Sequence, residues 1–218
     1  MLFQKVCEFT KAAQHNIIKK VKFLIAPCLL IVYKSSNFVG LKTETKITDA
    51  ARRTIEMERD AIGGLAQYLN EDFEKAIDTL TACKGRIVIS GIGKSAIIAQ
   101  KIVATLNSTG SPAIFLHAAD AIHGDLGMVQ QSDVVIIISK SGESPEIKVL
   151  VPLIKNFGNP LIGIVGSTTS FLAKKSDFVI NTTVSQEACP NNLAPTTSTT
   201  AQLVMGDAIA ICLMEKRG

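Results

Sequence analysis

The segment after the apolar run at residues 134–138 carries three hydroxyls and a glycine close together: Ser139, Ser141, Gly142 and Ser144. A proline follows, where it suits the first turn of a helix. Hydroxyls and the N–H groups of a helix N-terminus together bind a phosphate dianion without an arginine. Alternatively, Ser144 is an ordinary helix N-cap and the residues before it form a turn. The pattern allows both interpretations, and they are compatible.

A second glycine-rich loop, at residues 91–95, follows the apolar run at residues 87–89 and ends in Lys94 and Ser95. It is not a nucleotide-binding P-loop, because Val88 stands where that motif needs its first glycine. It also lacks the third glycine of a dinucleotide-binding loop. A helix that begins near Lys94 still offers positive potential to an anion, and the lysine adds a charge. The alternative is a solvated lysine at a helix start.

Two carboxylates and two histidines are candidates for acid–base chemistry. Glu146 lies just after the serine-rich loop, and Glu187 precedes Ala-Cys-Pro in the last long loop. His117 follows the second apolar run, and His123 stands in an Ile-His-Gly-Asp-Leu-Gly segment. Carboxylates and imidazoles in such loops can move protons on a small substrate, although a single surface carboxylate is more often structural. Two histidines without a nearby cluster of cysteines or carboxylates do not predict a structural metal site.

The elements that must position these side chains are strands alternating with helices. Strands are predicted at short apolar runs that end in polar or glycine-rich residues, namely 86–90, 112–116, 134–138, 161–165 and 178–182. Helices are predicted at 45–69, 72–82, 94–109, 145–157, 170–176 and 196–216, with a short helix or loop at 118–126. This alternation implies a parallel sheet covered on both faces, with ligands at the carboxyl ends of the strands. The last helix opens with hydroxyls at 196–200, a pattern that suits an anion or ordinary capping.

Composition allows one α/β domain and a tail. The chain has 218 residues, 47% of them apolar. Residues 1–42 have a net charge of +6 and the remainder −2, so the basicity belongs to the tail and we expect no nucleic-acid partner. The five cysteines contain no CxxC pair, which together with the α/β pattern indicates a reducing cytoplasm.

Residues 1–42 do not match the rest of the chain, and we expect the domain to occupy residues 43–218. Residues 21–33 are apolar behind three lysines, which is the shape of a signal peptide. They are too short to span a membrane, Pro27 interrupts them, and no small-residue cleavage site follows promptly. We therefore expect a poorly ordered or artefactual extension and no membrane partner, with a signal or anchor segment as the alternative.

Five segments in this order resemble the sugar-isomerase (SIS) domain, and within it the arabinose-5-phosphate isomerases of bacterial lipopolysaccharide and capsule synthesis. They are GIGKS at 91–95, HGDLGMV at 123–129, SxSGESxE at 139–146, EACP at 187–190 and LAPTTSTTAQLVMGDAIA at 193–210. The resemblance covers about residues 48–218. It implies a three-layer αβα sandwich around a five-stranded parallel sheet, preceded by N-terminal helices and assembled as a homotetramer.

The resemblance implies reversible conversion of D-ribulose 5-phosphate to D-arabinose 5-phosphate, which supplies Kdo for lipopolysaccharide or capsule. A base removes the proton next to the carbonyl, an enediol forms, and the proton returns to the neighbouring carbon. The resemblance implies no cofactor, in keeping with the absence of a nucleotide-binding motif. The partner it implies is a small sugar phosphate.

Site residues follow from the resemblance by position. Lys94, Glu146 and Glu187 match catalytic positions. His117 and His123 match substrate-contacting histidines; His123 also counts as catalytic, and His117 matches a possible zinc position. The other substrate-binding positions implied are Gly110, Ser111, Ser139, Ser141, Ser144, Thr183, Val184 and Ser185. Residue types suggest that Glu187 or a histidine moves the proton, and that Lys94 stabilises the enediolate.

The chain departs from the family pattern at several points. It stops before a His-Pro-Gly-Gly segment with a catalytic histidine, and it lacks the CBS domains that many members carry. Lys140 stands where asparagine is common, and residues 118–120 replace a Pro-Gly-Glu-like stretch. We expect either a truncated reading of a longer enzyme or a reduced form. The alternatives to this isomerase are a non-catalytic sugar-phosphate-binding module and an SIS isomerase of another sugar phosphate.

Overall fold

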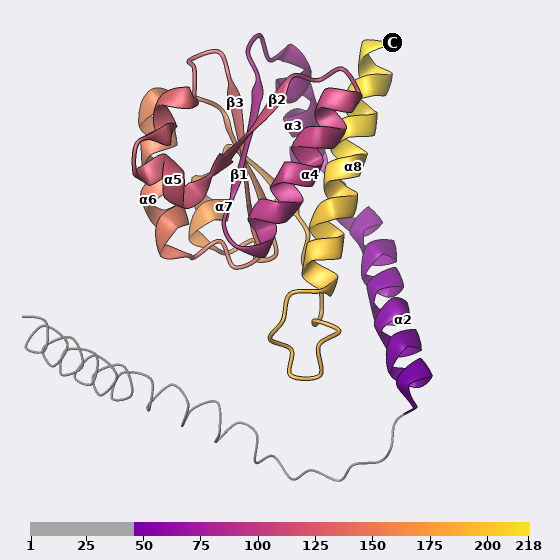
Figure 1. Ribbon diagram of the computed structural model, residues 1–218. Helices are drawn as coiled ribbons and strands as arrows, with labels where there is room; N and C mark the ends of the chain where they lie inside the picture. Colours follow the sequence, from indigo (N-terminus) through magenta and orange to yellow (C-terminus); the bar gives the residue numbers. More distant parts are fainter. Residues whose placement is uncertain (1–45) are drawn as a thin grey trace, which may run out of the picture. The chain divides into compact units, whose positions relative to one another are not determined.

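The computed structural model describes residues 46–218, in which parallel strands alternate with helices (Figure 1). The strands are β1 (Ile87–Gly91), β2 (Ala113–His117), β3 (Val134–Ser139), β4 (Leu161–Val165) and β5 (Phe178–Asn181). The α-helices are α2 (Ile47–Leu65), α3 (Glu71–Ala82), α4 (Lys94–Ser108), α5 (Ala118–Ile122), α6 (Pro145–Phe157), α7 (Phe171–Lys175) and α8 (Thr197–Arg217). Every predicted strand and helix is confirmed, with small shifts at the ends. The predicted extension, residues 1–42, lies outside the described residues.

One predicted helix, and the segment predicted as a short helix or loop, each form two pieces. The first helix was expected over residues 45–69, but α2 ends at Leu65 and a 3₁₀ turn, η1 (Ala66–Tyr68), follows. The Gly63-Gly64 pair just before this point has low helix propensity. The segment 118–126 forms α5 and a second 3₁₀ turn, η2 (Asp125–Met128). Gly124 separates them with a φ of 137°, which an α-helix cannot accommodate.

The sheet has the strand order β2-β1-β3-β4-β5, and all neighbours are parallel. The order reverses direction at β1, whose neighbours are β2 and β3. In such sheets the loops on either side of this switch point diverge and leave room for a ligand at the carboxyl edge. Gly91 at the end of β1 is level with His117 of β2 and Ile138 of β3. The loops after these strands therefore start from one edge.

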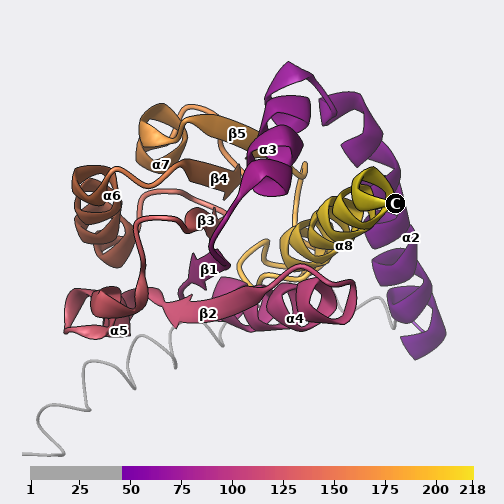
Figure 2. The same ribbon diagram turned by 90° about the horizontal axis from the view of Figure 1, so that it is seen from above.

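The sheet is the middle of three layers, which Figure 2 shows from above. Alternate side chains of β1 point to opposite faces. Ile87 and Ile89 pack in the cluster that contains α3, α4 and α8, whereas Val88 packs with α5, α6 and α7. Because β1, β3 and β4 are buried along their whole length, they read as continuous apolar runs. This confirms the predicted αβα fold.

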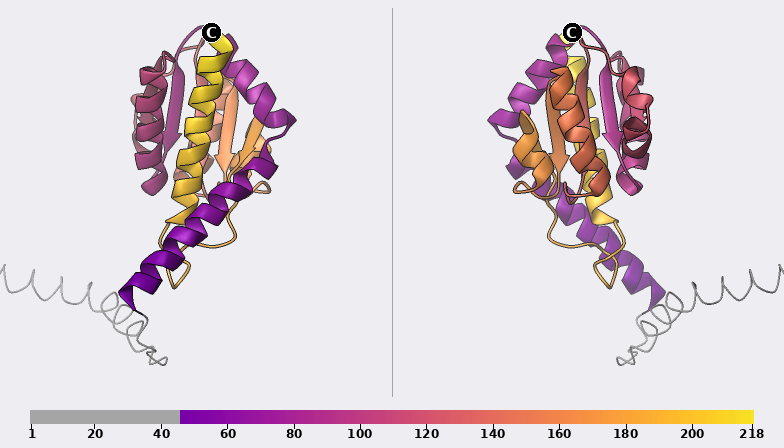
Figure 3. Two further views of the ribbon diagram at one scale, coloured as in Figure 1. Left: turned by 90° about the vertical axis from the view of Figure 1, so that its right-hand side faces the viewer. Right: turned by 90° about the vertical axis from the view of Figure 1, so that its left-hand side faces the viewer.

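Helix α8 is the only helix among residues 46–218 that is long and apolar enough to cross a membrane. Half of its most apolar window is buried inside the fold. It packs against α2, α3 and α4, as Figure 3 shows from two sides. This position in the core explains the apolar composition of α8.

Candidate active site

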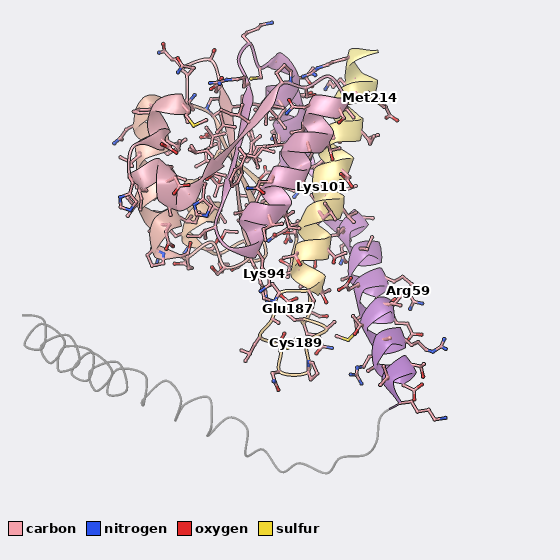
Figure 4. All side chains as sticks on the ribbon, viewed as in Figure 1. Arg59, Lys94, Lys101, Glu187, Cys189 and Met214 are labelled. Carbon is pink, nitrogen blue, oxygen red and sulfur yellow. The ribbon has the colours of Figure 1, made fainter. Side chains whose placement is uncertain are left out.

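A pocket of about 350 Å³ opens at the carboxyl edge of the sheet, where the loops after β1 and β3 meet the start of α8. Figure 4 places Lys94 and Glu187 at this end of the fold. The lining residues are Ile92, Lys94, Ser95, Ser139, Lys140, Ser141, Ser144, Pro195, Ser198 and Thr199. Helices α4, α6 and α8 all begin here, so the positive ends of three helix dipoles converge on the pocket. The site therefore suits a small anion.

The loop between β3 and α6 is shaped by its own serines. Ser139 Oγ accepts a hydrogen bond from Gly142 N (3.0 Å), and Gly142 takes a φ of 64° that favours glycine. Ser141 Oγ accepts from Glu143 N (3.3 Å). Ser144 is the N-cap residue of α6, but its side chain makes no capping bond, and its buried Oγ has no partner in the described part of the chain. The predicted N-cap position of Ser144 is confirmed, but its hydroxyl makes no capping bond and can serve a ligand.

Glu187 lies behind the pocket wall and caps the start of α8. Its Oε2 accepts hydrogen bonds from the backbone N–H groups of Thr196 (2.8 Å) and Ser198 (3.1 Å). Its Oε1 accepts from Ser198 Oγ (2.5 Å) and Lys140 Nζ (2.6 Å). Burial alone raises the pKa of the Glu187 carboxyl, but the bonds from Lys140, Ser198 and Thr196 outweigh burial and lower it to about 2. Such a carboxylate is a weak base, so its contacts disfavour the predicted proton transfer by Glu187, which stays a prediction.

Lys140 lines the pocket, although the sequence marked it only as a departure from the family pattern. Its side chain is 46% exposed, and its Nζ contacts Glu187. Its backbone oxygen accepts a hydrogen bond from Gly166 N (3.1 Å), in the loop after β4. A Cβ on Gly166 would come within 2.8 Å of that oxygen. Glycine at position 166 therefore lets the loop after β4 approach the loop after β3 closely. This contact holds the backbone of Lys140 in place.

Lys94 and Ser95 form the first turn of α4 at the pocket. The Lys94 side chain is exposed, and Ser95 Oγ donates to Gln202 Oε1 of α8 (3.1 Å). The sequence predicted Lys94 as a site residue but missed Ser95, although Ser95 stands in the same Gly-Lys-Ser segment. Ser198 and Thr199 lie in the hydroxyl run at 196–200, whose anion-binding pattern pointed to them.

The other predicted acid–base side chains lie outside the lining of this pocket. His117 ends β2, and its Nδ1 lies 3.5 Å from Asp120 Oδ2, too far for a hydrogen bond of good geometry. His123 is exposed after α5, and Glu146 is half-buried in the first turn of α6. The structure thus gathers Lys94 with the serines, and leaves these groups at the periphery.

The predicted zinc position has too few ligands. Among residues 46–218, no group of three or more His, Cys, Asp or Glu side chains could hold a metal ion. His117 has only the Asp120 carboxylate beside it, whereas zinc sites take three or four protein ligands. These two side chains do not make a zinc site by themselves.

Two predicted substrate-binding segments lie apart from the pocket. Gly110 and Ser111 precede β2, at the opposite edge of the sheet. There Arg217 Nη1 donates to Gly110 O (3.0 Å) and to Ser111 Oγ (2.7 Å). Residues 183–185, which are Thr183, Val184 and Ser185, line a different pocket of about 340 Å³ with residues of α2 and η1. Within one chain the structure therefore does not bring these segments to Lys94, and their substrate contacts stay predictions.

Comparison with known proteins agrees with this architecture. The family model of the SIS domain matches residues 80–212. "Arabinose 5-phosphate isomerase KdsD" of Pseudomonas aeruginosa is 52% identical over 169 residues, which are 78% of this chain and 52% of that protein. The protein of the same name in Escherichia coli K12 is 48% identical over 182 residues, 84% of this chain and 56% of its own. The chain thus spans about half the length of the curated relatives it matches.

One solved structure has the same fold as this chain over nearly the whole length of the solved protein. The structure of E. coli CFT073 c3406 in complex with arabinose 5-phosphate superimposes with a TM-score of 0.76 and 40% sequence identity, covering 80% of this chain and 93% of that one. The resemblance to arabinose-5-phosphate isomerases is confirmed by these relatives. Because the SIS model matches more than half of the residues, from the end of α3 through most of α8, the chain belongs to the SIS domain family.

Proposed function

We propose that this chain interconverts D-ribulose 5-phosphate and D-arabinose 5-phosphate through an enediol. The observation that carries the proposal is the pocket at the carboxyl edge, in which Lys94, Lys140 and several serines surround a volume of about 350 Å³. The chain is 40% identical to c3406, which was solved with arabinose 5-phosphate, and 52% identical to an isomerase over the aligned residues. A phosphate dianion matches the hydroxyls and helix N-termini of the pocket.

The lining residues suggest a division of roles. Ser141, Ser144 and the start of α6 bind the phosphate, and the Lys94 ammonium stabilises the negative oxygen of the enediolate. One C–H bond breaks next to the carbonyl and one forms on the former carbonyl carbon, while a proton passes from the oxygen of one carbon to that of the other, so the reaction needs no oxidant, and we propose no cofactor. Both oxygens of Glu187 already accept hydrogen bonds, so we propose that His117 or His123 moves the proton between the two carbons, although neither lines the pocket within one chain.

We also propose that the protein works as a homotetramer in the cytoplasm, where its product supplies Kdo for lipopolysaccharide or capsule. Ile47 and Ile55 on α2 are 89% and 69% exposed, and such apolar surface favours assembly. Within residues 46–218, Cys83, Cys189 and Cys212 form no disulfide, in keeping with a reducing compartment. Light scattering after size-exclusion chromatography should give about four times the mass of the chain; a monomer would contradict the assembly.

The test of the proposed function is turnover of D-arabinose 5-phosphate by the purified chain, followed by NMR as D-ribulose 5-phosphate appears. Lys94→Ala should lose most of this turnover. Lys101→Ala is the matched control, because Lys101 lies on the same helix but pairs with Asp207 of α8. It should keep turnover. Sugar-phosphate binding without turnover would favour a binding module, and a wild-type chain that neither binds nor converts the sugar would contradict the proposal.

A further inference from the structure

Lys140 is a charged residue of the pocket that the chemistry above does not use. Its ammonium carries three N–H donors, of which one bonds to Glu187 Oε1 (2.6 Å). The side chain lines the pocket together with Ser139, Ser141 and Lys94. We propose that Lys140 is the cation of the phosphate site, held at the pocket wall by Glu187, and that it sets how tightly the chain binds a phosphate dianion. The proposal rests on the proposed function only in placing the phosphate in this pocket.

The charges around the pocket support this role. Lys94 and Lys140 are its lining cations, and Glu187 is the buried carboxylate behind Lys140. With Lys140 in place, the Lys140–Glu187 pair is neutral and Lys94 leaves one net positive charge. Without Lys140, the Glu187 carboxylate would cancel Lys94 and repel an incoming dianion, and in a partly buried site such charges are weakly screened. Lys140 therefore attracts the anion and shields it from Glu187.

The surroundings of Lys140 also fix its position before a ligand binds. Glu187 is itself held by Ser198 and by the backbone of Thr196, so the carboxylate that orients the ammonium does not move freely. The backbone of Lys140 is anchored through its oxygen to Gly166 N. A lysine side chain usually loses much rotamer freedom when it binds a ligand. Since the ion pair has already restricted this side chain, less freedom is lost on binding.

Calorimetric titration with inorganic phosphate and with D-arabinose 5-phosphate tests the inference. Lys140→Met should lower the affinity for both ligands by roughly 10- to 100-fold, the range expected for the loss of a hydrogen bond to a charged group. Lys140→Arg, which keeps the charge, should stay close to the wild-type affinity. The loss of affinity on raising the salt concentration should be smaller in Lys140→Met, because one fewer cation then faces the anion.

A double variant separates a direct contact from simple neutralisation of Glu187. If Lys140 only neutralises Glu187, Lys140→Met with Glu187→Gln should regain the wild-type affinity, and this would overturn the proposal. We expect the double variant to remain at least roughly 10-fold weaker than the wild type. It also contains no unpaired buried charge, so it keeps the test valid if the single variant fails to fold.

The outcomes distinguish this inference from the proposed function. Phosphate affinity that is the same in the wild type and in Lys140→Met overturns the role of Lys140, even if turnover is intact. If the wild-type chain shows no turnover but Lys140→Met still binds phosphate more weakly than the wild type, Lys140 is supported as a phosphate ligand. Only the isomerase proposal is then contradicted. A wild-type chain that binds neither ligand overturns both.

Discussion

Replacing the Glu187 carboxylate by an amide should destabilise the protein by an amount that depends on pH. Hydrogen bonds from Lys140, Ser198 and Thr196 lower the carboxyl pKa from 4.5 to about 2 against the effect of burial. Each pKa unit corresponds to about 1.4 kcal/mol, so the ionised form contributes about 3 kcal/mol to the folded state. Glu187 is only 2% exposed, but its partner Lys140 is 46% exposed, so solvent screens part of the pairing and about 3 kcal/mol is the upper value. Glu187→Gln should lower the free energy of unfolding by up to about 3 kcal/mol at pH 6.

The pH dependence follows from the direction of the shift. The pKa is lower in the folded state than in the unfolded state, so the stabilisation is complete above pH 4.5 and is lost as the pH falls towards 2. The difference between the wild type and Glu187→Gln should therefore shrink from about 3 kcal/mol at pH 6 to about 1 kcal/mol at pH 3. The wild type should approach the variant, because its own carboxyl becomes neutral.

Urea unfolding at pH 6, 4 and 3 gives the difference in the free energy of unfolding between the wild type and Glu187→Gln directly. Far-UV circular dichroism is the readout, because the chain contains no tryptophan for fluorescence. Glu146→Gln is the matched control: Glu146 is half-buried at the start of α6, where a negative charge is worth less than about 1 kcal/mol. A deficit of Glu187→Gln that is equal at pH 6 and pH 3 would refute the reasoning, because the charge would then not be its source.

Two further variants test the loops around the pocket. Gly166→Ala places a Cβ within 2.8 Å of Lys140 O and should lower the free energy of unfolding by about 1–3 kcal/mol in urea. Gly127→Ala is its control, since nothing lies within 4 Å of a Cβ at that position; equal effects of the two would argue against the loop contact. Ser141→Ala combined with Ser144→Ala should weaken binding of D-arabinose 5-phosphate by roughly 10-fold in calorimetry. Unchanged affinity would place the phosphate elsewhere.

The fold could be predicted because its signals are local. The run at 134–138 is apolar throughout, and the corresponding strand β3 is buried at every residue. Pro145 marks the first turn of α6, and Gly158 ends that helix with a φ of 80°. Such features depend on neighbouring residues alone, so the order of strands and helices follows from the sequence. The split between α2 and η1 was missed because a glycine pair weakens a helix without fixing where it ends.

The site was predicted less completely, because a pocket depends on contacts between distant segments. Lys94 and the serines of the β3–α6 loop meet because parallel strands bring the loops that follow them to one edge. By the same rule Gly110 and Ser111, which precede β2, lie at the opposite edge of the sheet, where they contact Arg217. Their role was inferred from resemblance alone, and one chain does not bring them to the pocket.

The pairing of Lys140 with Glu187 shows why residue type alone does not assign a role. The two residues are 47 positions apart, and nothing near either of them in the sequence indicates the contact. A carboxylate in a loop beside a ligand site suggests a base, but in the folded chain it binds the start of α8 and the Lys140 ammonium. The same carboxylate then has a low pKa and serves to place a cation. In this chain, therefore, Glu187 meets the pocket through Lys140, and the proposed contribution of Lys140 to anion binding depends on both residues.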